Sequence, residues 1–283
     1  MTCDYQRFTT LFREVARALQ SIATTPDLMH KLIARIFGSI VMTIVAVQPV
    51  WADDALTAGN QAGQLTIATQ VLDRYQQALG GEQAIANVKS MTVRGETEST
   101  ATGKSTFIYY AKPFKSLFKI TRADGTQITA GFDGKVSWTI TSKGAEIDKD
   151  TPLDAIRRDA DLQYPLHQSD YFKKLELAGI RDFEGHRCYW LHGTTNWGKD
   201  NNQFYDVETG LLVGYRFQSD DLSKTLTFAI FEDYRNFGGP LIATRNTTRA
   251  GNNSRTSIYK SVSYESLADS IFELPPAVKA LVK

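Results

Sequence analysis

Histidine and cysteine side chains are the first candidates for chemistry, because together they can hold a zinc ion. His186, Cys188 and His192 occupy alternate positions of one β-rich segment, so their side chains would share one face. Residues 186 and 192 would then stand ~20 Å apart at ~3.3 Å per residue, which is too far for one ion. We therefore predict no metal site and interpret the three as two strand-end histidines and a small buried thiol.

Phosphate-binding and nucleophile motifs are incomplete. Gly103-Lys104-Ser105 resembles the end of a phosphate-binding loop, but that pattern needs glycine where Glu98 stands and a helix where a β-rich segment follows. The chain has no Gly-x-Ser-x-Gly elbow and no His-Glu-x-x-His. We predict no catalytic residues, no cofactor and no enzymatic activity. A secreted hydrolase, whose groups converge only in the fold, is the enzymatic alternative.

Acidic side chains gather between residues 148 and 161. They are Asp148, Asp150, Asp154, Asp159 and Asp161. A calcium loop would need a glycine at a fixed offset and a terminal Glu, and neither is present. We interpret these residues as a solvated acidic face.

Aromatic residues give the positive signal, because many fall on segments that favour β-structure. They would form an ordinary core or the wall of an apolar pocket for an acyl chain. A 16-carbon chain withdrawn from water would gain on the order of 10 kcal/mol at ~0.8 kcal/mol per methylene, before ordering costs. The residues predicted to line such a pocket are Trp138, Tyr215, Phe217 and Phe228.

Two helices are expected to precede the strands. Apolar residues from Ile67 to Leu79 recur at helical spacing, and Gly80-Gly81 supplies a left-handed stop. A second short helix is expected from Glu82 to Val88. From Ser90 onward the pattern becomes strand and turn, with a helical insertion near residues 152–158 and 169–173.

The strand segments number about eleven, and the short turns between them favour antiparallel neighbours. Leu211, Val213, Tyr215 and Phe217 alternate with more polar residues, so one face must be buried. A sheet this wide curls. The predicted fold class is mainly β with α: a single curved antiparallel sheet, a half-barrel, covered by N-terminal helices and the insertion. Its concave face could be filled by side chains or hold an apolar cavity, and the sequence leaves both open.

An apolar segment near the N-terminus has the pattern of a secretion signal. Lys31 and Arg35 precede the apolar stretch 36–50, and Val50-Trp51-Ala52 fits a cut before Asp53. The stretch is shorter than the roughly 20 residues that span a bilayer. We expect residues 1–52 to be an upstream extension plus signal peptide, with translation starting at Met29. A basic amphipathic arm is the alternative for residues 1–28.

The remaining residues 53–283 would form one domain, exported to the periplasm or secreted, and soluble after signal cleavage. The cut removes five of 32 Lys/Arg and three of 31 Asp/Glu, which leaves 27 basic and 28 acidic residues and a net charge of −1. Such a surface has no general attraction for nucleic acid. Cys3 would leave with the signal, so Cys188 would have no disulfide partner.

Several short motifs, in their order, resemble the outer-membrane lipoprotein-sorting (LolA-like) superfamily. They are Val71-Leu72-Asp73-Arg74-Tyr75 with Ala78-Leu79-Gly80-Gly81, Gly131-Phe132-Asp133-Gly134-Lys135 with Trp138, Tyr205-Asp206-Val207-Glu208-Thr209-Gly210-Leu211-Leu212, Asp233-Tyr234-Arg235, and Ser270-Ile271-Phe272-Glu273-Leu274-Pro275. The likeness spans most of residues 67–276. It implies an eleven-stranded half-barrel closed by helices, a hydrophobic cavity, and periplasmic carriage of lipoproteins or lipids without metal or cofactor.

We therefore expect a non-enzymatic periplasmic carrier or binder of a lipid or lipoprotein acyl chain. Its partners would be a lipid or an acylated protein, with an inner-membrane exporter and an outer-membrane receptor as further candidates, and no nucleic acid. The alternative is an envelope protein-interaction or sensor module of the same fold without bound lipid. Its mark would be an exposed apolar patch on the convex face or at a sheet edge.

Overall fold

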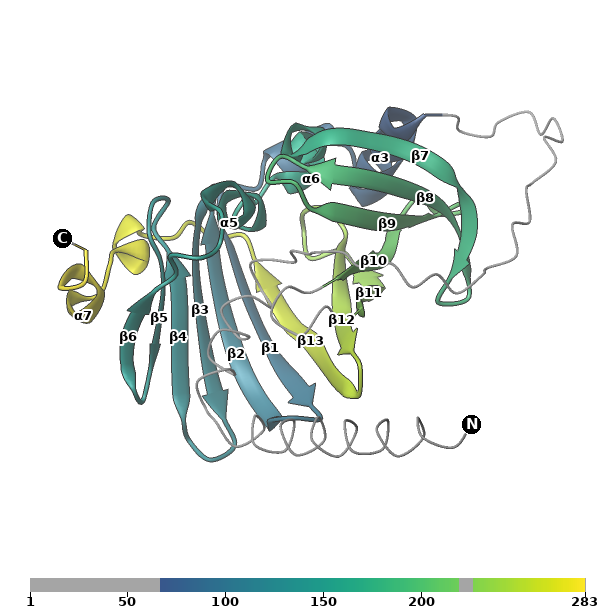
Figure 1. Ribbon diagram of the computed structural model, residues 1–283. Coiled ribbons are helices and arrows are strands. Elements are labelled where there is room, and N and C mark those ends of the chain that lie inside the picture. The colour runs from purple at the N-terminus through teal and green to yellow at the C-terminus, as the bar shows by residue number, and fades with distance from the viewer. Residues whose placement is uncertain (1–66, 219–225, 283) are drawn as a thin grey trace, which may run out of the picture.

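The computed structural model describes residues 67–218 and 226–282. The predicted signal, the start at Met29 and the cut after Ala52 lie outside these ranges. The described chain forms one antiparallel sheet of thirteen strands, in the order β6-β5-β4-β3-β2-β1-β13-β12-β11-β10-β9-β8-β7 (Figure 1). The strands are β1 Met91–Ser99, β2 Gly103–Lys112, β3 Lys115–Arg122, β4 Gln127–Phe132, β5 Ser137–Thr141, β6 Gly144–Ile147, β7 Phe172–Phe183, β8 His186–Thr195, β9 Asp200–Asp206, β10 Leu212–Gln218, β11 Leu226–Arg235, β12 Ile242–Ala250 and β13 Asn253–Ser263.

Short helices accompany the sheet. They are α3 Ala68–Leu79, α4 Glu82–Ala86, α5 Leu153–Asp159, α6 Tyr164–His167 and α7 Pro276–Lys279, with 3-10 turns η1 Gln168–Tyr171 and η2 Asp269–Phe272. Figure 1 shows the sheet curving strongly between its two ends, with α3, α5 and α6 along one side. The predicted curved antiparallel sheet is confirmed. Within the described ranges no helix is long and apolar enough to cross a membrane.

The predicted count of about eleven strands is too low. Strand β6, Gly144–Ile147, was not predicted. It is only four residues long and half-exposed, so its sequence carries no run of alternating apolar residues. The tight turn before it uses Gly144 at φ 122°, a left-handed conformation that glycine adopts without strain.

Helix α3 forms where the apolar spacing predicted it. Val71, Leu72, Tyr75 and Leu79 are buried along one stripe, which is the pattern of a helix that packs on a core. Gly80 ends the helix in the left-handed conformation, and backbone N–H groups of Gly80 and Gly81 close the last turn on Gln77 and Gln76. The buried stripe therefore packs the helix on the sheet in this state.

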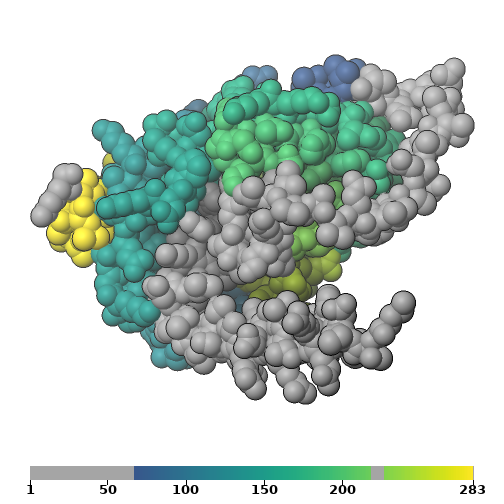
Figure 2. Space-filling model, viewed as in Figure 1, coloured from purple at the N-terminus to yellow at the C-terminus, as the bar shows by residue number. Residues whose placement is uncertain are grey.

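The two faces of the sheet carry separate cores. The helix face, as we call it, packs Tyr189, Leu191, Tyr205 and Leu212 against α3. The outer face is the opposite side of the same strands and buries Phe183, Cys188, Phe204 and Val213. In the other half of the sheet, Val93, Phe107, Phe118, Ile120 and Ile128 form a third cluster, and Leu117 and Trp138 pack on the reverse side with Phe272 and Val278 of the C-terminal segment. Figure 2 shows that segment, in yellow, against the edge of the sheet.

A β-bulge changes one predicted face. The register of β10 with β9 shifts between Leu212 and Gly214. Leu212 therefore packs on the helix face, whereas Val213 packs on the outer face. The prediction that Leu211, Val213, Tyr215 and Phe217 share a face is wrong at Val213, because the bulge adds one residue to the alternation.

Candidate functional site

A pocket lies between the N-terminal helices and the helix face, with a volume of about 310 Å³. This is at the lower end of the roughly 300–1,000 Å³ that is typical of ligand sites. Its wall combines apolar side chains from helices and loops with aromatic side chains from strands: Tyr75, Leu79, Ile85, Val88, Met91, Leu162, Pro165, Leu212, Tyr215, Phe231, Tyr234, Pro240, Leu241, Ile242, Ala243, Asn246, Tyr259 and Tyr264. Among its described lining residues there is no Lys, Arg, Asp, Glu or His, so the chemistry these residues offer is burial of an uncharged apolar group.

The four predicted lining residues do not gather in one place. Tyr215 lines the pocket and meets Phe231 edge-on, with ring centroids 5.4 Å apart. Phe217 lies two positions along β10 and is buried at 5% exposure outside the lining. Trp138 is buried against the C-terminal segment, and Phe228 packs with the outer-face cluster. Of these four side chains, only Tyr215 is in contact with the pocket.

The sequence reading missed the part of the wall that does not come from strands. Leu79, Ile85 and Val88 come from α3, α4 and the residues after them, and Leu162 and Pro165 come from the insertion. The apolar stripe of α3 was visible in the sequence as a signal for burial. What the stripe faces depends on long-range packing, and no local pattern reports that.

Tyrosine hydroxyls add uncharged polar groups to the pocket wall. Burial, and then the neighbouring Tyr215, raises the pKa of Tyr75 far above its ordinary value, and burial raises the pKa of Tyr215 and of Tyr259 to about 12. All three hydroxyls are therefore protonated at neutral pH. Tyr234 on β11 is a fourth tyrosine of the pocket wall. Its hydroxyl donates to the carbonyl oxygen of Leu212 at 2.8 Å, which holds the Tyr234 ring against β10.

A buried polar network stands beside the pocket. Gln168 Nε2 donates to Gln203 Oε1 and to the Tyr205 hydroxyl, both at 2.6 Å, and the Tyr205 hydroxyl donates to Gln203 Oε1 at 2.8 Å. Gln203 lies opposite Tyr215 in the ladder of β9 with β10. The network thus ties η1 to β9, the neighbour of the pocket-lining strand β10.

Two of the acidic residues predicted to be solvated are instead partnered. The Arg158 guanidinium pairs with the Asp159 carboxylate at 2.6 Å and lies over the Trp197 ring at 5.0 Å. The Asp161 carboxylate, 2% exposed, accepts from His167 Nδ1 at 2.8 Å and from the Tyr171 hydroxyl at 2.9 Å. These contacts tie the insertion together and join it to Trp197, in the loop between β8 and β9, so the solvated-face prediction is wrong for Asp159 and Asp161.

The histidine and cysteine candidates do not converge. His186 Nδ1 meets Asp206 Oδ2 at 3.1 Å, while His192 Nδ1 lies 3.3 Å from Asn202 Oδ1. Cys188 is fully buried, and burial followed by the charges of Asp206 and Asp182 raises the pKa of its thiol to about 12. Among the described residues, no three His, Cys, Asp or Glu side chains are placed to hold a metal ion.

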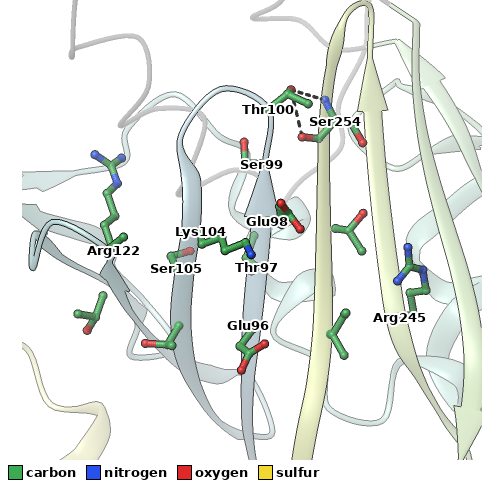
Figure 3. Close-up of a pocket in the computed structure, with 15 residues that line it drawn as sticks. Glu96, Thr97, Glu98, Ser99, Thr100, Lys104, Ser105, Arg122, Arg245 and Ser254 are labelled. Atoms are coloured by element: carbon green, nitrogen blue, oxygen red, sulfur yellow. Dashed lines mark hydrogen bonds between the residues drawn. The ribbon is translucent and has the colours of Figure 1, made fainter.

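A second hollow, of about 730 Å³, lies over β1, β2 and β13 (Figure 3). Its wall is mostly polar. Glu98 on β1 lies directly opposite Lys104 on β2, and Thr100 and Ser254 exchange hydrogen bonds at its upper edge. Glu96, which also lines the hollow, pairs with Lys260 at 3.1 Å. The charges compensate one another on an open surface, and the hollow lacks the apolar lining of the first pocket.

Solved structures match this fold, although no protein-family model and no curated protein matches the chain. A DUF1329 family protein from Desulfovibrio piger superposes with a TM-score of 0.52 at 14% identity, over 72% of this chain and 96% of that one. A LolA superfamily protein from Nitrosomonas europaea gives a TM-score of 0.52 at 14% identity, over 75% of this chain and 99% of that one. The sheet therefore has the LolA-like fold, as the resemblance predicted.

Proposed function

We propose that this chain is a non-enzymatic, exported binder or carrier of a lipid or lipoprotein acyl chain. The observation that carries the proposal is the pocket beneath α3, whose described wall contains no ionisable group that is charged at neutral pH. The LolA-like fold supports it, because the solved protein from Nitrosomonas europaea is described as a LolA superfamily member. We place the protein in the periplasm on the strength of the predicted signal alone.

The size of the pocket limits what it can hold in this state. About 310 Å³ suits a short apolar group. A longer chain requires α3 to move away from the sheet, which would expose the apolar stripe of Val71, Leu72 and Tyr75 to the ligand. The gain of ~0.8 kcal/mol per buried methylene would then be offset by the loss of helix packing. We expect affinity to rise with chain length and then level off.

The test is a binding titration with fatty acids of 8 to 16 carbons, read by displacement of a fluorescent fatty acid from the purified protein. Leu162→Trp places a large ring in the pocket wall from a loop. Its matched control is Leu226→Trp, at a side chain that is 47% exposed and outside the pocket. We expect Leu162→Trp to weaken binding at least tenfold and Leu226→Trp to leave it unchanged. Equal affinities for the two variants, or no binding by the unaltered protein, would contradict the proposal.

A further inference from the structure

The outer face of strands β7 to β12 carries three arginines whose guanidinium groups lie over aromatic rings. The Arg181 guanidinium lies over the Trp190 ring at 4.5 Å. Arg216 lies over Phe204 at 6.0 Å, and Arg249 lies over Phe228 at 5.7 Å. The ladders place Arg216 directly opposite Phe228, and Phe228 directly opposite Arg249. We call these three arginines, with their rings, the arginine platform.

The rings form a rigid floor for the platform. Phe183 stacks on Phe204 with centroids 4.1 Å apart and an interplanar angle of 4°. Gly214 lies against this stack, because a Cβ there would come within 2.7 Å of the Phe183 ring. Phe204 is 3% exposed, and the indole Nε1 of Trp190 donates to Asn202 Oδ1 at 2.8 Å. The guanidinium groups therefore rest on side chains that are themselves fixed.

Two of the three arginines have no carboxylate partner in the described part of the chain. Arg249 pairs with Glu184. Across residues 67–218 and 226–282, by contrast, neither Arg181 nor Arg216 has a carboxylate oxygen within 4.0 Å. Burial, and then the like charge of Arg181, lowers the pKa of Arg216. The two guanidiniums thus repel each other, and the described residues of this face supply neither of them with a carboxylate partner.

This arrangement does not serve folding. Like charges near a partly buried site destabilise the compact state, and stacking on a ring returns only ~0.5–2 kcal/mol. A flat guanidinium keeps its N–H groups at the edge of the plane, which is the geometry that binds a carboxylate in two parallel hydrogen bonds. The His192 and Asn202 side chains adjoin Arg216 in the same cross-strand row. They add polar groups to a surface already suited to oxyanions.

We propose that the arginine platform is a docking surface for an acidic segment of a partner protein. Charge complementarity selects the partner, because the guanidiniums of Arg181 on β7 and Arg216 on β10 pair with no carboxylate of the described residues and match the carboxylates of an extended acidic segment that crosses these strands. An anionic bilayer fits less well, since the rings of the platform lie beneath the arginines and do not project to enter hydrocarbon. This role is separate from acyl-chain binding, because the platform and the pocket lie on opposite faces of the sheet.

The test is fluorescence anisotropy with a labelled deca-glutamate peptide and the purified protein at low salt. We expect Arg181→Gln and Arg216→Gln each to weaken binding about tenfold, the change for loss of a charge-assisted hydrogen bond. The matched control is Arg245→Gln, at an arginine that pairs with Glu232 at 3.3 Å, and it should bind normally. Affinity should fall as salt screens the charges.

Stability separates a docking role from a structural one. Because Arg216 is partly desolvated and lies beside Arg181, Arg216→Gln should unfold at the same temperature as the unaltered protein or a higher one. If Arg216→Gln loses peptide binding because it no longer folds, the role of Arg216 is structural and its docking role is wrong. Arg181→Gln, at an exposed side chain, tests the docking role independently. Three outcomes would overturn the proposal: no binding, equal loss in Arg245→Gln, or binding to phosphatidylglycerol vesicles without binding to the peptide.

Discussion

The ring of Tyr75 on α3 meets the ring of Tyr205 on β9 edge-on, with centroids 5.2 Å apart. Tyr205 is fully buried, and its hydroxyl joins the bonds between Gln168 and Gln203. One residue thus links three elements: the helix that covers the pocket, the turn η1 and the sheet. The fit of α3 on the sheet depends on this residue both through its ring and through its hydroxyl.

We predict that Tyr205→Phe will lower the free energy of unfolding by roughly 1–3 kcal/mol, because the two glutamine amides would keep their burial and lose a partner. Urea unfolding measures this directly. The control is Tyr110→Phe, at a half-buried tyrosine that makes no side-chain hydrogen bond within the described ranges. It should change stability by ~0.5 kcal/mol or less. Equal effects of the two substitutions would show that the network is energetically neutral.

We predict that Gly131→Ala will destabilise the fold because of Trp138 alone. A Cβ at Gly131 would stand 2.6 Å from the Trp138 ring, and overpacking of this kind costs about 1–3 kcal/mol. The clash involves a side chain, so Trp138→Phe should relieve it. Within the described structure Trp138 Nε1 has no hydrogen-bond partner, so this second change breaks none. In a double-mutant cycle, Gly131→Ala should be less destabilising beside Phe than beside Trp. An identical loss in both backgrounds would contradict the steric explanation.

The features predicted correctly from the sequence are those that depend on residues close together in the chain. The stripe of α3, its Gly80 stop and the short turns between strands follow from local physics, and the antiparallel curved sheet follows from them. The bulge at Leu212–Gly214 does not, because an extra residue in one strand leaves no mark in composition. The predicted pocket wall differs from the observed one for another reason, which is that Phe228 and Trp138 pack away from the helix face.

The polar features of the site were harder still to foresee. Asp161 was read as part of an acidic face, yet it is buried by His167 and Tyr171, six and ten residues later. Neither Arg181 nor Arg216 was predicted to be a functional residue, since single arginines on strands are ordinary. Their role follows only from the strand pairing of β7 to β12, which shows that neither has a carboxylate partner among the described residues.

We predict that Cys188 will be inert in the folded protein. Its thiol is buried, and a pKa of about 12 leaves about one thiolate in 10⁴ at pH 8. Iodoacetamide at pH 8 should therefore modify Cys188 only after denaturant is added. Peptide mapping reports Cys188 separately from Cys3, which serves as the comparison wherever it is retained. Rapid modification of Cys188 without denaturant would mean that the outer-face core opens readily.

The tyrosines of the helix face predict how stability depends on alkaline pH. Burial raises the pKa of Tyr215 and Tyr259 from an ordinary value of 10.0 to about 12. An unfolded chain loses these protons near pH 10, whereas the folded chain holds them, so the folded state binds more protons between pH 10 and 12. Stability must therefore be unaffected by these groups below pH 10 and fall as pH rises from 10 to 12. Tyrosinate absorbance should accordingly rise in two stages, first from exposed tyrosines and then together with unfolding seen by circular dichroism. Tyr215→Phe should remove part of the slope, and a single smooth titration near pH 10 with the fold intact would show that the helix face is open to water.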